Sequence, residues 1–335
     1  MEIFIFLLVA AGAYFFYKKK TKKASLVKSP ADYKIGTNYS FGLGFPQMDA
    51  LAAEVFTASA KNGDVDSYAA LGNMYARGIH FKKDYEEAYK WLKLAADSDH
   101  PTAMFELSKF YIEGYGIPKD EQKSMSLLIR ASELGEPSAQ FLLGLIYQEG
   151  GFGLEKNQRE SLNWFMKSAK LGNAEAQVYV GDAYLEGNLL SKDIGKAFEY
   201  WTKAAENNNI LAMKRLRVFY IDGIDEIESN LELAFHWTKK AAELDDCESQ
   251  SSLGGDFLVG TTGHIDYEQA YVWSKLAADK GDERAQYALG IMCKRGFFED
   301  GVNLDEARYW FELAARQGFQ PAIDELASLD IVDKI

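Results

Sequence analysis

A leucine or valine followed by a small residue recurs along this chain every 36 or 37 residues. A period this steady is typical of an array in which each repeat packs on its neighbours, so no single core has to enclose all 335 residues. The pairs in this register are Leu71-Gly72, Leu107-Ser108, Leu143-Gly144, Val180-Gly181, Leu216-Arg217, Leu253-Gly254 and Leu289-Gly290, six with a small second residue and one with arginine. The period therefore disfavours folds with one closed core.

Each repeat carries the signals of two helices. A glycine that can adopt a positive φ stands where a first helix should end, and a residue that can cap a second helix follows six or seven positions later. The glycines are Gly78, Gly114, Gly150, Gly187, Gly223, Gly260 and Gly296. The capping residues are Asp84, Asp120, Asn157, Asp193, Asn230, Asp266 and Asn303. The second helices are expected to end at Asp99, Gly135, Gly172, Asn208, Asp245, Gly281 and Gly318.

Large and small side chains keep the same register in the repeats. We expect the large side chains of the second helix to fill gaps between helices, and pairs of alanine or serine to let helix backbones approach. The large positions are Trp91, Leu127, Trp164, Tyr200, Trp237, Trp273 and Trp310. The small pairs begin at Ala95, Ala131, Ser168, Ala204, Ala241, Ala277 and Ala314. Each repeat is therefore predicted to be a helix pair.

Over residues 49–329 this pattern resembles the Sel1-like repeat family, a relative of the tetratricopeptide repeats. The resemblance implies an all-α, right-handed α-solenoid of about seven helix pairs, whose first helices line a concave surface. Within residues 48–329 it implies a half-repeat cap at 49–63 and a capping helix at 321–329, followed by a tail at 330–335. The repeats between them span about 64–99, 100–135, 136–172, 173–208, 209–245, 246–281 and 282–318.

Two repeats depart from the family pattern. Arg217 replaces the small residue of the fifth repeat. The sixth repeat contains two stretches rich in small residues, Gly254-Gly255 and Thr261-Thr262-Gly263, which are expected to loosen its packing. We expect packing near these positions to differ from that of the other repeats.

The N-terminal residues 1–23 form a separate module, which we interpret as a membrane anchor. Ile3 to Tyr17 is uncharged, and five lysines follow between Lys18 and Lys23. The run spans about 22 Å of a hydrocarbon core of about 30 Å, so a helix at about 3–20 would need the flanking residues to help. Lysines stay cytoplasmic, which places the repeats on the cytoplasmic side after a linker at 24–47. A cleaved signal peptide and a surface-bound helix are the alternatives.

Charge and composition disfavour several classes of function. The net charge of −13 is the opposite of what nucleic-acid binding requires. Two cysteines and four histidines show no metal-ligand spacing, and His236 and His264 have no partnered nucleophile at recognisable spacing. The glycine-rich loop at 150–153 lacks the strand and the ending of a phosphate-binding loop. We therefore predict no enzymatic activity, no cofactor and no metal.

The predicted function is that of a non-catalytic, membrane-tethered adaptor that binds a protein or peptide in the groove of the solenoid. The alternatives are a secreted or periplasmic repeat protein with an envelope-related enzymatic or enzyme-regulating role, and a structural spacer without a ligand. Transferring the groove positions of tetratricopeptide-like pairs, as the resemblance allows, implies a set of partner-binding residues. They are Phe105, Lys109, Ile112, Phe141, Leu145, Gln148, Val178, Asp182, Arg284, Tyr287 and Lys294.

Overall fold

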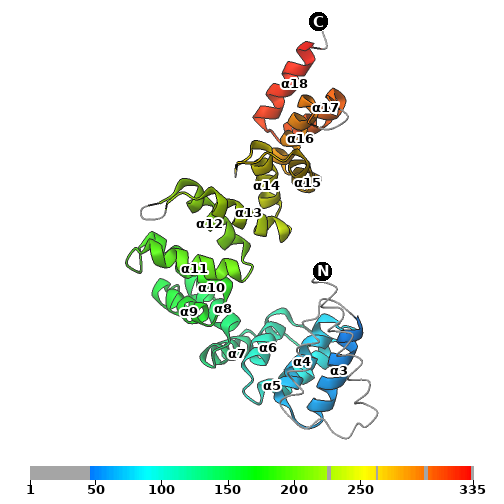
Figure 1. Cartoon of the computed structure of the whole chain (residues 1–335). Helices are drawn as coiled ribbons and strands as arrows, with labels where there is room; N and C mark the ends of the chain where they lie inside the picture. The colour runs from blue at the N-terminus through cyan, green and yellow to red at the C-terminus, as the bar shows by residue number, and fades with distance from the viewer. Residues whose placement is uncertain (1–45, 225–227, 262, 298–300, 333–335) are drawn as a thin grey trace, which may run out of the picture. The chain divides into compact units, whose positions relative to one another are not determined.

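The computed structural model describes residues 46–224, 228–261, 263–297 and 301–332. Within these ranges sixteen helices follow one another, and strand-like pairing is limited to isolated bridge positions, at Gly151, Leu154 and Ile224 (Figure 1). The predicted all-α class is confirmed. The predicted anchor at 3–20 and most of the linker that follows it lie outside the described residues. Among the helices described, none combines the length and the apolar character needed to cross a membrane.

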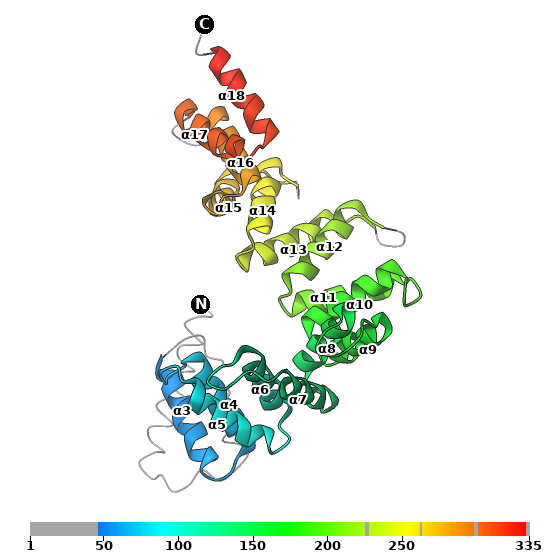
Figure 2. The same ribbon diagram turned by 180° about the vertical axis from the view of Figure 1, so that it is seen from behind.

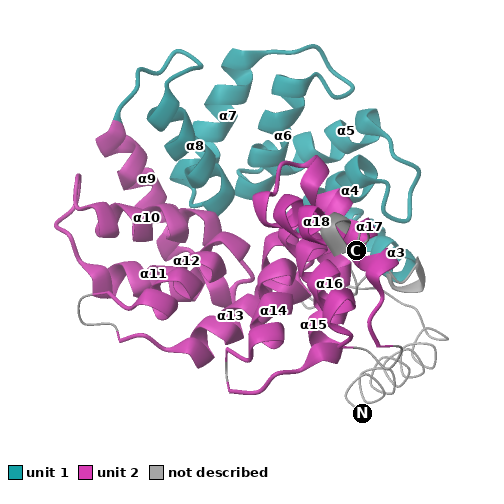
Figure 3. Cartoon of the chain, turned by 90° about the horizontal axis from the view of Figure 1, so that it is seen from above, with its two compact units in different colours: residues 1–157 teal, residues 158–335 magenta. Residues whose placement is uncertain are grey.

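The chain divides into two compact units, residues 1–157 (unit 1) and 158–335 (unit 2), which Figure 3 shows in teal and magenta. In unit 1 each described helix packs on the next, and α4 also contacts α6 (Figures 1 and 2). The helices of unit 1 are α3 (Pro46–Ala60), α4 (Val65–Arg77), α5 (Tyr85–Ala96), α6 (Pro101–Glu113), α7 (Glu121–Glu133) and α8 (Pro137–Glu149).

Unit 2 repeats the same arrangement, with each helix packed on the next one in the chain and α14 also in contact with α16. Its first five helices are α9 (Gln158–Lys170), α10 (Ala174–Glu186), α11 (Ile194–Glu206), α12 (Ile210–Asp222) and α13 (Leu231–Glu243). The others are α14 (Cys247–Val259), α15 (Tyr267–Asp279), α16 (Glu283–Arg295), α17 (Leu304–Arg316) and α18 (Gln320–Val332).

The helices end where the capping residues predict. All seven glycines that were expected to end first helices have positive φ, between 68° and 80°. The second helices begin directly after the predicted aspartates and asparagines, as where Asp193 Oδ1 accepts a hydrogen bond of 2.9 Å from the Lys196 amide. The step from glycine to cap is six residues in four repeats and seven in three, whereas the other intervals within the repeat are constant.

The turn that leads into each first helix was only partly predicted. Its positive φ occurs at the expected positions, including the non-glycine residues Asp99, Asn208 and Asp245. The residue that follows each turn caps the next first helix through its side chain, a role that the sequence pattern left unassigned. These caps are Asp64, His100, Glu136, Asn173, Asn209, Asp246 and Asp282.

The small residue of the recurring pair lies against the second helix of its own repeat. A Cβ on Gly181 would come within 2.6 Å of Trp201 Nε1, and a Cβ on Gly290 within 2.4 Å of Phe311 Cε1. Trp201 and Phe311 are both fully buried. The side chain that fills this space therefore belongs to the residue after the predicted large column, although Trp237 in that column is itself buried.

Candidate partner-binding groove

Unit 1 contains a groove of about 480 Å³ on the C-terminal halves of its first helices. Residues of α4, α6 and α8 line it, and Met125 and Leu128 of α7 contribute buried apolar surface. A cavity of this size falls in the range of about 300–1,000 Å³ in which proteins hold ligands. The lining residues used below are Arg77, Lys109, Ile112, Glu113, Tyr115 and Phe152. We call this surface the unit 1 groove.

An aromatic stack fixes one part of the unit 1 groove. Gly114 ends α6 with a φ of 76°, and the turn that follows brings Tyr115 onto Tyr85, the first residue of α5. The two rings are parallel, with centroids 4.6 Å apart, and Phe110 meets Tyr115 edge-on at 5.7 Å. Because glycine adopts positive φ without steric cost, the capping residue also determines where Tyr115 lies.

Charges of both signs line the unit 1 groove. Lys109 Nζ lies 2.6 Å from a carboxylate oxygen of Glu106 and 4.8 Å from the centre of the Phe105 ring. Arg77 and Glu113 are exposed at the ends of α4 and α6. Apolar and charged groups are thus presented together, a combination that suits a peptide or protein surface better than a purely apolar molecule.

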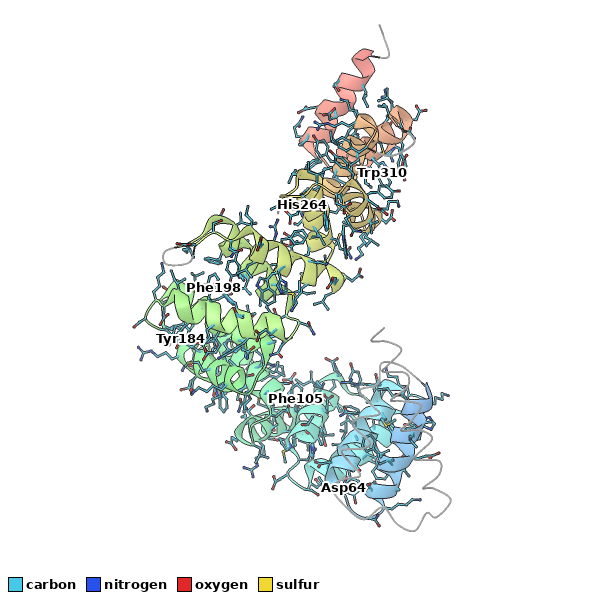
Figure 4. All side chains as sticks on the ribbon, viewed as in Figure 1. Asp64, Phe105, Tyr184, Phe198, His264 and Trp310 are labelled. Atoms are coloured by element: carbon cyan, nitrogen blue, oxygen red, sulfur yellow. The ribbon has the colours of Figure 1, made fainter. Side chains whose placement is uncertain are left out.

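The residues predicted in unit 1 separate into two groups. Lys109 and Ile112 line the unit 1 groove. Phe105, Phe141, Leu145 and Gln148 are half-buried and do not line it. Phe105, labelled on α6 in Figure 4, contacts the groove residue Lys109 through its ring, which lies against the Lys109 ammonium.

Two of the predicted residues in unit 2 serve the core. Val178 is 3% exposed and packs in a cluster with Ala197 and Trp201, so the prediction that it faces a partner is wrong. The reason is that the core cluster containing Val178 includes residues of both α11 and α12, which cover this part of α10. The Tyr287 ring packs against Phe311 and Phe319, with centroids at 5.7 and 5.4 Å, and therefore belongs to the core around α17 rather than to an open surface.

Asp182 holds three helices of unit 2 together. Its Oδ1 accepts a hydrogen bond of 3.1 Å from the Nε1–H of buried Trp201 on α11, and its Oδ2 lies 3.2 Å from Arg215 Nη2 on α12. Burial raises the pKa of Asp182, and the charge and hydrogen bond of Arg215 oppose that rise. The side chain predicted to contact a partner is therefore engaged in the structure.

Two predicted cations in unit 2 lie in ion pairs. Arg284 Nη2 is 3.4 Å from Asp282, and both residues are at the start of α16. Lys294 Nζ is 2.5 Å from Glu325 and thereby connects α16 to α18. Exposed pairs of this kind contribute about 0–1 kcal/mol, and Arg284 is the more exposed of the two cations.

Several residues of the unit 1 groove were missed because the prediction considered only fixed positions on first helices. Tyr115 and Phe152 follow the glycines that end α6 and α8, outside those positions. Arg77 belongs to the first repeat, for which no site residues were predicted. A large aromatic residue directly after a helix-ending glycine is a sequence signal that could have found Tyr115.

Histidines and cysteines are the candidates for a metal site or a nucleophile among the described residues. The described part of the chain contains no group of three His, Cys, Asp or Glu side chains arranged to hold a metal ion. His100 is a helix cap whose Nε2 lies 3.1 Å from Asp66, and His236 is exposed with its ring edge-on to Trp237 at 5.0 Å. Burial raises the pKa of the Cys293 thiol to about 11, which makes it a poor nucleophile.

Successive capped helix pairs with a period of 36–37 residues define an all-α repeat protein of the solenoid class. The chain belongs to the Sel1 repeat family. The family matches seven consecutive stretches, at residues 65–100, 101–136, 137–173, 174–209, 211–246, 248–282 and 283–319.

Similar proteins include regulators and structural neighbours with the same fold. The chitin synthase regulator SKT5 of Saccharomyces cerevisiae is 28% identical over 311 residues, which are 90% of this chain and 40% of that protein. The c5321 protective antigen of uropathogenic Escherichia coli, described as an SLR fold, has a TM-score of 0.70 and 30% identity and covers 83% of this chain and 59% of its own. A Sel1 repeat protein from Oxalobacter formigenes has a TM-score of 0.57 at 28% identity, over 89% of this chain and 85% of its own. This chain spans less than half the length of the curated relatives it matches.

Proposed function

We propose that the protein is a non-catalytic adaptor that binds a protein partner in the unit 1 groove and regulates it. The observation that carries this proposal is the groove itself, in which an apolar interior and exposed charges of both signs lie side by side. Interfaces combine an apolar centre with a polar rim in the same way. The name of the relative from Saccharomyces cerevisiae, a chitin synthase regulator, supports a regulatory role in which the partner is an enzyme.

We further propose that the adaptor is tethered to a membrane and that its repeats lie on the cytoplasmic side. The support is the uncharged run from Ile3 to Tyr17 and the five lysines that follow it. Lysines next to an apolar segment favour the cytoplasmic side, and each contributes about 1 kcal/mol to attraction by anionic lipid. The net negative charge of the rest of the chain disfavours close contact of the repeats with such a surface.

Partner capture tests the adaptor function. The full-length chain serves as bait in detergent-solubilised membranes, next to a groove variant that carries Arg77→Ala and Lys109→Ala. A matched control carries Lys90→Ala and Lys93→Ala on the exposed face of α5, so that both variants lose two positive charges in unit 1. We expect the groove variant to lose about tenfold or more of the capture seen with wild type, and the control to retain it.

Two results would oppose the groove as the binding surface. One is equal capture by the groove variant and wild type, and the other is an equal loss in the matched control. Circular dichroism and melting curves of the three proteins are compared first, because a loss of fold would also abolish capture.

Topology is tested separately by fusing reporters to Ile335. A reporter active only in the cytoplasm should give signal, and one active only outside the cytoplasm should not. Replacing the five lysines with glutamine should weaken the orientation while the repeats stay folded. Signal from the external reporter on the wild-type chain would contradict the cytoplasmic assignment.

A further inference from the structure

A second cavity, of about 240 Å³, lies between α12 and α14 in unit 2. It is smaller than the pockets of about 300–1,000 Å³ that enclose small molecules, and its size suits one or two side chains of a peptide. Its lining includes Leu211, Val218 and Arg217 from α12 and Glu248 from α14. The lining of this cavity shares no residue with the unit 1 groove and includes none of the partner-binding residues predicted from the sequence.

The residue that gives the cavity its chemistry is Arg217. Five of the seven repeats have glycine at this position, where a second-helix side chain fills the space. In the fourth repeat that space is filled by a large side chain of the second helix, Trp201, and the equivalent residue of the fifth repeat is Thr238. Thr238 is small and 1% exposed, and its hydroxyl donates a hydrogen bond of 2.8 Å to the Ala234 carbonyl. The fifth repeat thus combines a long cationic side chain on the first helix with a small side chain on the second.

Arg217 also retains an unused hydrogen-bond donor. Its Nε is buried and has no hydrogen-bond partner within the described residues, although the guanidinium interacts electrostatically with Asp256. The neighbouring cations are engaged: Lys214 pairs with Glu248, and Arg215 lies 3.2 Å from Asp182. A buried donor without an acceptor is destabilising, and a hydrogen bond to an incoming carboxylate removes that cost.

Apolar side chains stand beside this donor. Leu211 and Val218 are 49% and 52% exposed, one turn before and one residue after the cationic positions of α12. Phe219, which also lines the cavity, is held by Phe198 of α11, labelled in Figure 4, at a ring distance of 5.6 Å, and the Phe198 ring meets Tyr220 at 5.5 Å. Three cations and one carboxylate line the cavity, in a chain whose net charge is −13.

We propose that the α12–α14 cavity binds a partner segment in which a carboxylate side chain stands next to an aliphatic one. The carboxylate accepts hydrogen bonds from Arg217, and the aliphatic side chain covers Leu211 and Val218. The acceptor is an acidic group, because the unpartnered donor belongs to a cationic side chain and a charged acceptor forms the stronger hydrogen bond with it. The site is a second docking surface, so its failure would leave the proposed role of the unit 1 groove intact.

The test is a peptide selection that isolates this cavity. A random peptide library displayed on phage is first depleted on the full-length Arg217→Gln variant and then selected on the full-length wild-type chain, both in a mild detergent. Glutamine keeps most of the length and loses the charge. We expect the selected peptides to be enriched in Asp or Glu adjacent to Leu, Ile, Val or Phe.

A selected peptide, labelled with fluorescein, then gives the affinities. It should bind the wild type and the matched control Lys239→Gln equally, and Arg217→Gln about tenfold more weakly. Replacing its acidic residue with the amide should cause the same loss on the wild type and no further loss on Arg217→Gln, as expected for two groups that contact each other. Leu211→Ser with Val218→Ser, at two half-exposed positions, should also weaken binding and serves if Arg217→Gln fails to fold.

Three outcomes would overturn the proposal. The first is a selection that yields no acidic enrichment, and the second is equal affinity of the peptide for wild type and both cavity variants. The third is self-association of the wild type that Arg217→Gln abolishes, because a second copy of this chain would then be the occupant.

Discussion

Asp182 illustrates, at the scale of single residues, how a charge on a first helix can serve the fold. Its position in the repeat matches the partner-facing positions of related helix pairs, yet its carboxylate accepts the Trp201 indole N–H and pairs with Arg215. A fully buried indole needs an acceptor for its N–H group, and the acidic side chain supplies it. Position within a repeat therefore does not by itself distinguish a binding residue from a supporting one.

Replacing Asp182 with alanine should lower the free energy of unfolding by about 1–3 kcal/mol, because the Trp201 N–H is left buried without an acceptor. Asp182→Asn should lose less, since the amide oxygen can still accept. Urea unfolding monitored by circular dichroism measures both. Equal stability of wild type and Asp182→Ala would show that the hydrogen bond contributes nothing.

The pKa of Asp182 adds a pH dependence to this comparison. Burial raises it above the ordinary 3.8, so the folded state binds the proton more tightly than the unfolded state. The stability gained from that proton is complete below 3.8 and is lost as the pH rises through the folded pKa. Wild type should therefore gain stability relative to Asp182→Asn as the pH is lowered through this window.

The two cysteines should differ in reactivity. Cys293 is 1% exposed, and burial raises its pKa to about 11, so little thiolate forms near pH 8. Burial also raises the pKa of Cys247, but this residue is only half-buried. A thiol reagent such as DTNB should modify Cys247 first and Cys293 only on unfolding. Loss of the fast phase in Cys293→Ser, rather than in Cys247→Ser, would contradict this order.

At the scale of elements, an aromatic pair at equivalent positions joins consecutive repeats at two places in the chain. Tyr85 stacks on Tyr115 at 4.6 Å in unit 1, and Tyr267 stacks on Phe297 at 4.1 Å in unit 2. In both pairs the first residue of a second helix meets the residue after the next helix-ending glycine. These pairs connect the end of one helix to the beginning of another and so help to fix the register between repeats.

Two helix glycines provide a matched test of helix packing. A Cβ on Gly290 would come within 2.4 Å of the buried Phe311 ring, whereas a Cβ on Gly255 would meet nothing within 4 Å. Gly290→Ala should therefore destabilise the protein by about 1–3 kcal/mol, as overpacking does. Gly255→Ala should stabilise it by about 0.5–1 kcal/mol, because alanine favours a helix interior. Chemical unfolding of both variants gives the two signs, and the same sign for both would contradict this account.

The elements could be predicted from the sequence more completely than the groove. Helix ends depend on residues close in sequence, such as Gly114 with its positive φ or Asp193 with its capping carboxylate. Such residues can be recognised in a single amino-acid sequence. The groove depends on which side of a helix its neighbour covers. Lys109 and Asp182 each follow the small residue of their repeat directly, yet the first lines a groove and the second accepts a hydrogen bond from buried Trp201. That difference arises from tertiary contacts between helices, which a repeat pattern does not contain.

At the scale of the whole molecule, an array needs an end that does not expose its core. In unit 2 the last helix described is α18, whose Ala322 and Leu329 are 0% and 4% exposed and pack with the core around α17. Deleting residues 319–335 should lower the free energy of unfolding of unit 2 by more than the roughly 2–5 kcal/mol that replacing a single buried leucine with alanine costs. The deletion should also promote self-association, because it exposes the core of the last repeat. Urea unfolding and analytical ultracentrifugation measure the two effects, and Ala322→Glu should shift both in the same direction. An unchanged, monomeric truncated chain would show that α18 is dispensable.

The step from helix-ending glycine to helix cap is the one part of the repeat whose length varies, six residues in some repeats and seven in others. Each extra residue therefore enters on the connection after a first helix, and the interval from one helix-capping turn to the next small residue is never altered. Insertions at these connections leave the spacing of the helices unchanged. They are the places where an epitope, a protease site or a new recognition loop could be grafted into this chain, and where lineages of such arrays can diverge in length without losing their fold.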